Sequence, residues 1–151
     1  MDLKTTLDME DLEPLVELAR AFIEESIYAS EGFDEVSVRR LFEATIHKPS
    51  EFAVFYLKED DIIQGFYLMG IASRFFNKCC YAADLGVYLR PEIRGRYLSV
   101  RMVVAAEKWA KQHGAESLYM GISAGINVER TERLYSLFGY TKACLTFKKE
   151  L

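Results

Sequence analysis

The sequence lacks the features that mark membrane, secreted and metal-binding proteins. No run of apolar residues approaches the roughly 18 that a membrane-spanning helix needs. The first residues show no basic stretch followed by an apolar core, so no secretory signal is predicted. The three cysteines (Cys79, Cys80 and Cys144) form neither a disulfide framework nor a metal-type spacing. We therefore expect a cytoplasmic protein with reduced thiols and no metal.

Positive charge is also in short supply. The 19 Lys and Arg residues are outnumbered by 23 Asp and Glu, which gives a formal net charge of −4 and a pI near 5.3. A protein that binds the nucleic-acid backbone needs a basic footprint. We therefore expect neither a nucleic-acid nor a membrane partner.

The sequence does contain enough material for one well-packed domain. Its 151 residues are half hydrophobic and 13% aromatic, with no repeat and no linker-like stretch. A chain of this length is the usual size of a single domain with one buried core. We predict one domain over residues 1–151.

Hydrophobic periodicity predicts ten elements in the order β-α-α-β-β-β-α-β-α-β. The expected strands cover residues 3–7, 52–57, 62–71, 79–89, 117–122 and 140–147. The expected helices begin near Asp11, directly after an N-cap at Ser37, and near Leu98 and Val128. Strands 79–89 and 117–122 flank a helix, so they should be parallel neighbours. The prediction is an α/β fold, with a central mixed sheet flanked by helices on both faces.

One loop carries a chemical signal. The strand that ends at Leu89 runs through a glycine loop into the helix near Leu98. Such a junction directs unpaired backbone N–H groups and the positive end of the helix dipole at one point, which favours an anion. Arg94 and Arg96 add positive charge. The dinucleotide pattern GxGxxG and the loop GxxxxGK[ST] are both absent.

The segment from Leu89 to Ser99 instead resembles motif A of the GNAT superfamily of acetyl-CoA-dependent N-acetyltransferases. The resemblance implies that loop amides hold the pyrophosphate of acetyl-CoA and that the Leu89 backbone meets the pantetheine arm. The residues assigned to the cofactor in this way are Leu89, Arg94, Gly95, Arg96, Tyr97, Leu98 and Ser99. Tyr97 stands where the family usually has a second glycine, which leaves open whether the backbone there needs a positive φ.

A second match lies downstream, where Leu134-Tyr135 is followed by Gly139-Tyr140. This segment looks like motif B of the same family. The resemblance implies that Tyr135 is the general acid that protonates the departing thiolate, and that Asn127 contacts the cofactor. From its sequence context alone, Tyr135 would be a core aromatic residue on a helix face.

Asp84 is the only charged residue of the strand 79–89. A carboxylate there is costly unless it is paired or wetted by a cleft. The family often places an acidic base on this strand, which would make Asp84 the general base; a structural aspartate is the alternative. Sequence identity says little about the oxyanion donor, for which we expect the Leu89 N–H.

The resemblance implies transfer of an acetyl group from acetyl-CoA to a primary amine, on a small molecule or a peptide, by direct attack in a ternary complex. The alternatives are a non-catalytic acyl-CoA-binding or regulatory module of the same fold, and a nucleotide-binding interaction domain. The acceptor pocket would involve residues 27–38 and the last hairpin. Tyr28, Phe33, Phe75 and Phe76 are candidate aromatic lining, with core packing as the alternative for each. Homodimers are common in such folds.

Overall fold

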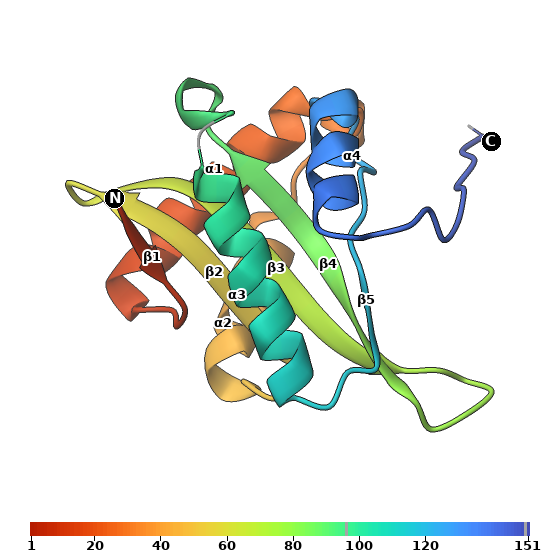
Figure 1. Ribbon diagram of the computed structural model, residues 1–151. Coiled ribbons are helices and arrows are strands. Elements are labelled where there is room, and N and C mark those ends of the chain that lie inside the picture. Colours follow the sequence, from red (N-terminus) through yellow and green to blue (C-terminus); the bar gives the residue numbers. More distant parts are fainter. Residues whose placement is uncertain (96, 150) are drawn as a thin grey trace.

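A computed structural model describes residues 1–95, 97–149 and 151. At its centre is one mixed sheet with the strand order β1-β2-β3-β4-β5, shown in Figure 1. The strands are β1 (Asp2–Lys4), β2 (Phe52–Glu59), β3 (Ile62–Ser73), β4 (Cys80–Leu89) and β5 (Ser117–Tyr119). The first four pair antiparallel, and β4 and β5 pair in parallel, as the crossover rule predicts.

In the described part of the chain, four α-helices cover the two faces of the sheet (Figure 1). They are α1 (Leu12–Glu25), α2 (Glu35–His47), α3 (Leu98–Gln112) and α4 (Val128–Leu137), and the short 3-10 turns are η1 (Met9–Asp11), η2 (Ala29–Glu31) and η3 (Pro91–Ile93). Helices α1 and α2 pack on one face, and α3 and α4 pack on the other. None of the helices in the described part of the chain is long and apolar enough to cross a membrane.

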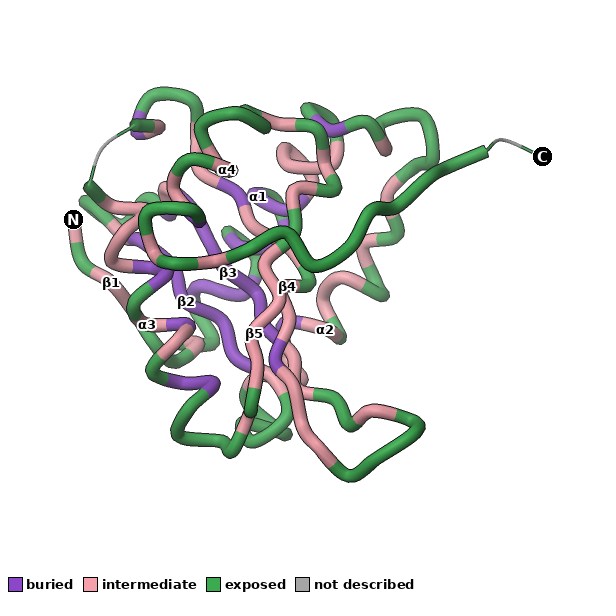
Figure 2. Tube along the Cα trace, turned by 45° about the vertical axis from the view of Figure 1, so that its right-hand side comes forward, coloured by how far each residue is buried: buried purple, intermediate pink, exposed green. Residues whose placement is uncertain are grey.

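Alternation along the central strands divides the core in two. On β2, Val54 and Tyr56 face α1 and α2, whereas Phe55 and Leu57 face α3. The α3 core also contains Trp109, which is 8% exposed. Figure 2 shows the resulting band of buried residues along β2 and β3. Buried side chains therefore cover both faces of the central strands β2 and β3.

The structure differs from the sequence-based prediction at the C-terminal end. The described residues after α4 form no strand, although we expected one over residues 140–147. Residues 141–149 are exposed and run away from the sheet (Figures 1 and 2). The expected strand has the right alternation, but it finds no neighbour to pair with.

Two element starts also differ from the prediction. Helix α2 begins at Glu35 and is capped by Asp34, whose Oδ1 accepts from the Val36 and Ser37 N–H groups. The Ser37 hydroxyl donates to the same carboxylate at 2.6 Å, so Ser37 supports the cap without being it. The first strand lies at Asp2–Lys4, earlier than the expected 3–7.

Candidate active site

A cleft opens where β5 separates from β4. The two strands pair only from Tyr81↔Ser117 to Ala83↔Tyr119. On the other side of β4, Met69 pairs with Asp84 and Leu68 with Gly86, so Leu85 is the extra residue of a β-bulge. The chain that follows β5 is drawn toward α1, because the Ile27 N–H donates to the Ala124 carbonyl at 3.1 Å.

The cleft has a volume of about 1020 Å³ and two chemically distinct sides. The side formed by α1 and its neighbours, here called the α1 wall, is lined by Phe22, Ile23, Tyr28, Leu85 and Ile126. The opposite side, the α4 wall, is lined by Gly95, Tyr97, Ser99, Arg130, Arg133, Leu134 and Tyr135. Asp84 also lines the cleft; it pairs with Met69, whose side chain belongs to the α3 core, and it directly follows the last β4 residue that pairs with β5.

The glycine loop forms one end of the α4 wall. Gly95 has φ +81°, a conformation that side-chain-bearing residues rarely adopt. Tyr97 has φ −58° and is 72% exposed, so the backbone at this position does not require a glycine. Leu98 and Ser99 form the first turn of α3, which has no side-chain cap, so its N–H groups remain available to an anion. Arg96 lies outside the described residues.

Arg94 is joined to the end of α1. Its guanidinium donates to both carboxylate oxygens of Glu25, at 2.5 and 2.6 Å, and its Nε donates to the Leu89 carbonyl at 2.8 Å. The Tyr88 hydroxyl donates to the same Glu25 carboxylate at 2.9 Å. Arg94 holds the pKa of Glu25 below its ordinary value. Glu25 therefore offsets the charge of Arg94, and the pair ties the loop to α1.

Leu89 presents its backbone to the cleft. The Arg90 N–H donates to the Gln64 carbonyl, and the register continues with Gly65 opposite Leu89. In an antiparallel pair, neighbouring residues point their backbone groups to opposite sides. The Leu89 N–H and carbonyl therefore point away from β3, toward the side that β5 has left open.

Tyr135 places a hydroxyl on the α4 wall without a protein partner. The side chain is buried, and its oxygen makes no hydrogen bond among the described residues. Burial, and then the neighbouring Tyr67 and Asp84, raise its pKa well above that of an ordinary tyrosine. Burial also raises the pKa of Tyr67 to about 12. Both phenols therefore stay protonated and can act as donors throughout the neutral pH range.

Asp84 carries a titratable carboxylate into the same region. Its Oδ1 accepts from the Gly121 N–H at 2.7 Å. Desolvation raises its pKa to about 6, and the hydrogen bond from Gly121 opposes that rise. Asp84 is therefore ionised at neutral pH, yet it has a proton affinity well above that of a surface aspartate.

The start of α4 completes the α4 wall. Asn127 has φ +48° and precedes the first residue of the helix, and its carbonyl accepts from the Thr131 N–H at 3.0 Å. Asn127 itself lines the cleft. Arg130 extends toward the glycine loop: its Nη1 lies 3.7 Å from the position that a Cβ on Gly95 would occupy. The sequence pattern did not identify Arg130 as a cofactor residue, although its guanidinium lies beside Gly95.

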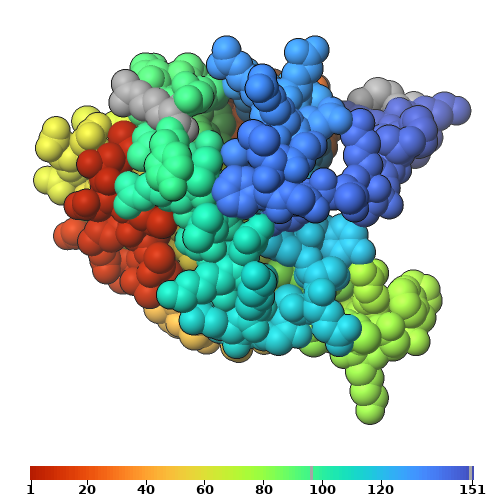
Figure 3. Space-filling view, in the orientation of Figure 1, coloured from red at the N-terminus to blue at the C-terminus, as the bar shows by residue number. Residues whose placement is uncertain are grey.

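The four aromatic acceptor candidates divide between different regions. Tyr28 lines the cleft, whereas Phe33 packs beneath the Arg20 guanidinium, 4.5 Å from ring centroid to Cζ. Phe75 and Phe76 lie in the β3–β4 turn, where Phe75 is 100% exposed. This hairpin projects from the body of the molecule in Figure 3, and neither phenylalanine lines the cleft. Only Tyr28 therefore belongs to the cleft lining.

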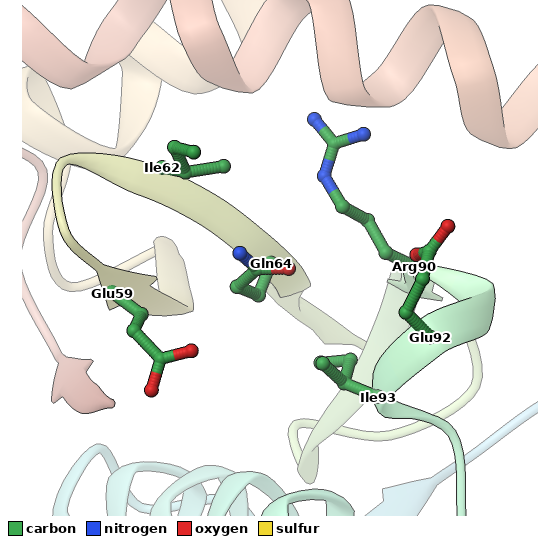
Figure 4. A pocket seen from close by; sticks show the side chains of 6 residues that line it. All are labelled: Glu59, Ile62, Gln64, Arg90, Glu92 and Ile93. Carbon is green, nitrogen blue, oxygen red and sulfur yellow. The ribbon is translucent and has the colours of Figure 1, made fainter.

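A smaller cavity of about 500 Å³ lies near the β2–β3 turn and η3. Figure 4 shows its lining side chains, and the Arg90 and Glu59 side chains point in different directions. The Arg90 Nε is already engaged with the Ile63 carbonyl at 2.9 Å. This cavity shares no lining residue with the cleft and brings no catalytic set together. The described residues also contain no group of three His, Cys, Asp or Glu suited to a metal.

Comparison with known proteins agrees with this geometry. No curated protein sequence matches the chain significantly. Among solved structures, AAC(6')-Iy bound to a bisubstrate analog is 15% identical, over 99% of this chain and 98% of that chain, with a TM-score of 0.76. A transcriptional regulator from Bacillus halodurans is 17% identical, over 99% of both chains, with a TM-score of 0.76.

A third structure, the ribosomal-protein-alanine N-acetyltransferase from Brucella melitensis, is 12% identical over the full length of both chains, with a TM-score of 0.71. At these identities the likeness establishes the fold. The family model described as the acetyltransferase (GNAT) family matches residues 15–140. The chain therefore belongs to the GNAT acetyltransferase family.

Proposed function

We propose that this protein transfers the acetyl group of acetyl-CoA to a primary amine by direct attack in a ternary complex, with Tyr135 as the general acid. The observation that carries the proposal is the buried, unpartnered Tyr135 hydroxyl, which lines the same cleft as the Gly95 loop. A buried hydroxyl without a partner is costly in a purely structural role. A departing sulfur at this position would supply the missing acceptor.

The described residues fit acetyl-CoA. Gly95 has the positive φ of an anion cradle, and the first turn of α3 has no side-chain cap. Leu89 presents backbone groups along the open edge of β4, and Arg130 adds charge beside the loop. We assign the pyrophosphate to the loop amides and Arg130. Because Glu25 offsets the charge of Arg94, we assign Arg94 the positioning of the loop.

When bound, acetyl-CoA supplies the thioester whose acetyl carbon the amine attacks. Asp84 accepts the proton that the ammonium must lose before the nitrogen can attack. The Leu89 N–H faces the cleft and donates to the oxygen on which negative charge develops. As the carbon–sulfur bond breaks, Tyr135 donates its proton to the departing sulfur, and the second proton that the nitrogen loses on forming the amide restores the Tyr135 hydroxyl. Asn127 borders the cofactor side of the cleft.

The acceptor is a small-molecule or peptide amine in this proposal. The similar structures include one bound to a bisubstrate analog of CoA and acetylneamine and one named for a ribosomal-protein alanine. We place the reaction in the cytoplasm. The three described cysteines are free thiols, as that compartment favours.

Two measurements test the function in sequence. Acetyl-CoA should raise the melting temperature more than ATP or NAD at equal concentration, because a ligand of the native state stabilises it. Free thiol should then appear when acetyl-CoA is mixed with a panel of primary amines. Stabilisation by acetyl-CoA without thiol release for any amine would indicate that the protein is a non-catalytic acyl-CoA-binding module. The absence of stabilisation would contradict both.

A further inference from the structure

The α1 wall is apolar over the part of the cleft that the glycine loop does not reach. Phe22 and Ile23 come from the last turns of α1, and Tyr28 follows that helix. Leu85 lies on the same face of the sheet as Gly70, because its Cδ1 is 3.2 Å from the position that a Cβ on Gly70 would occupy. Its side chain is 49% exposed. This wall presents hydrocarbon and aromatic surface to whatever lies opposite the cofactor loop.

Negative charge is scarce along the same surface. Among the described residues that line the cleft, Asp84 is the only carboxylate. Glu25 lies close by, but both of its oxygens are held by Arg94 and one also by Tyr88. Glu31, in the η2 turn, forms an ion pair with Lys148 at 2.7 Å. The cleft therefore offers one carboxylate for one ammonium group.

Positive charge on the opposite side adds to this asymmetry. Arg130 and Arg133 line the α4 wall, and neither has its charge offset by a carboxylate that lines the cleft. Their charge suits the phosphates of a cofactor. A second ammonium group on an acceptor would meet apolar surface on one side and like charge on the other, and it would lose hydration without gaining a partner.

We infer that the acceptor is a monoamine that carries its single ammonium group on an apolar or aromatic body. This inference rests on the proposed function. Asp84 pairs with the ammonium group and takes its proton, while Phe22, Ile23, Tyr28 and Leu85 cover the hydrocarbon part. Polyamines and aminosugars with several ammonium groups are poor acceptors in this cleft.

A matched pair of amines tests the inference. Hexylamine and hexane-1,6-diamine have the same chain length and differ only in the second ammonium group. In a thiol-release assay at pH 7.5, we expect kcat/KM for hexylamine to exceed that for the diamine at least tenfold, with 2-phenylethylamine comparable to hexylamine. Equal values, or a preference for the diamine, would overturn the acceptor assignment. Thiol release with neither of these amines but with another amine of the panel would also overturn the acceptor assignment, whereas no release with any amine, from protein that binds acetyl-CoA, would overturn the proposed function itself.

A variant of the α1 wall provides a second test. Leu85→Glu adds a carboxylate to a half-exposed position of that wall, and Leu85→Gln adds the same shape without charge. We expect Leu85→Glu to reduce the preference for hexylamine at least fivefold relative to Leu85→Gln, by improving kcat/KM for the diamine. Both variants should keep the acetyl-CoA thermal shift of the wild type. An unchanged preference in Leu85→Glu would show that the missing counter-charge does not set acceptor choice.

Discussion

The two walls of the cleft are built on opposite faces of one sheet, and they differ in almost every chemical respect. The α4 wall offers a glycine with positive φ, free helix N–H groups, two arginines and a phenol. The α1 wall offers aliphatic and aromatic side chains. Asp84 lines the same cleft, on the face of the sheet that α3 covers. Under the proposed function, charge recognition belongs to the cofactor, whereas the acceptor is recognised mainly by burial of apolar surface.

The largest expected effect comes from removing one hydroxyl from the α4 wall. Tyr135→Phe should lower kcat by roughly 10- to 100-fold, because the departing sulfur loses its proton donor. Acetyl-CoA affinity, measured by titration, should stay within twofold of the wild-type value. Tyr140→Phe is the matched control, because that hydroxyl is also buried and unpartnered but does not line the cleft. Equal losses in the two variants would assign Tyr135 a structural role.

Asp84→Asn should remove the pH dependence of kcat/KM that the Asp84 carboxylate causes. With a pKa of about 6, Asp84 becomes ionised as pH rises, so wild-type kcat/KM should increase up to about pH 6 and then level off. The variant should be at least roughly tenfold less active at pH 7.5 and lack this acidic limb. An unchanged limb in Asp84→Asn would assign the titration to another group.

The same substitution should also change how stability depends on pH, because the buried Asp84 carboxylate destabilises the fold when it is ionised. The folded-state pKa of Asp84 lies above that of an unfolded aspartate, so the native state binds the extra proton between about pH 4 and 6. As pH rises over that range, the titration of Asp84 should therefore lower the unfolding free energy of the wild type by at most about 3 kcal/mol. Urea unfolding curves of Asp84→Asn should lack this decline. An Asp84→Asn protein less stable than the wild type above pH 6 would contradict the desolvation argument.

A moderate effect is expected from Gly95→Ala, which places a side chain in a left-handed conformation that costs about 1–2 kcal/mol. Because the strained residue belongs to the cofactor loop, acetyl-CoA affinity should fall by up to roughly tenfold. Gly139→Ala is the comparison: its φ is +82°, its surroundings are open, and it does not line the cleft. That variant should lose stability and retain its affinity for acetyl-CoA.

The smallest effect concerns the contact that joins the two walls. In a double-mutant cycle of Glu25→Gln and Arg94→Gln, the two side chains should show a coupling of about 1 kcal/mol in unfolding free energy. Both groups keep some exposure to solvent, which limits the value. A coupling near zero would mean that Arg94 is not tied to α1 in solution.

Much of the α4 wall could be read from sequence, because its residues follow one another along the chain. The loop from Leu89 to Ser99 combines a strand end, a glycine and a helix start, and each of these leaves a local signal. The contact between Glu25 and Arg94 leaves none, since 69 positions separate the partners. The sequence likewise could not reveal that Glu25 offsets the charge of Arg94.

The α1 wall and the C-terminal segment show where periodicity is insufficient. Phe75 and Phe76 have the same aromatic character as Tyr28, yet the hairpin carries them away from the cleft. Residues 140–147 alternate as a strand should, but alternation specifies a face and not a partner. Leu85 lies on the α1 wall because of a β-bulge, and the sequence of β4 does not predict that bulge.

The burial of Trp109 in the α3 core determines how unfolding can be observed. It is the single tryptophan among nine tyrosines, and its ring packs against Phe55 and His113, with centroids 6.5 and 5.0 Å apart. Its fluorescence therefore reports the α3 side of the sheet alone, whereas buried tyrosines lie on both sides, Tyr56 and Tyr88 with α1 and Tyr67 and Tyr135 with α3. Coincident tryptophan and tyrosine melting curves would show that one sheet unfolds both cores as a single cooperative unit.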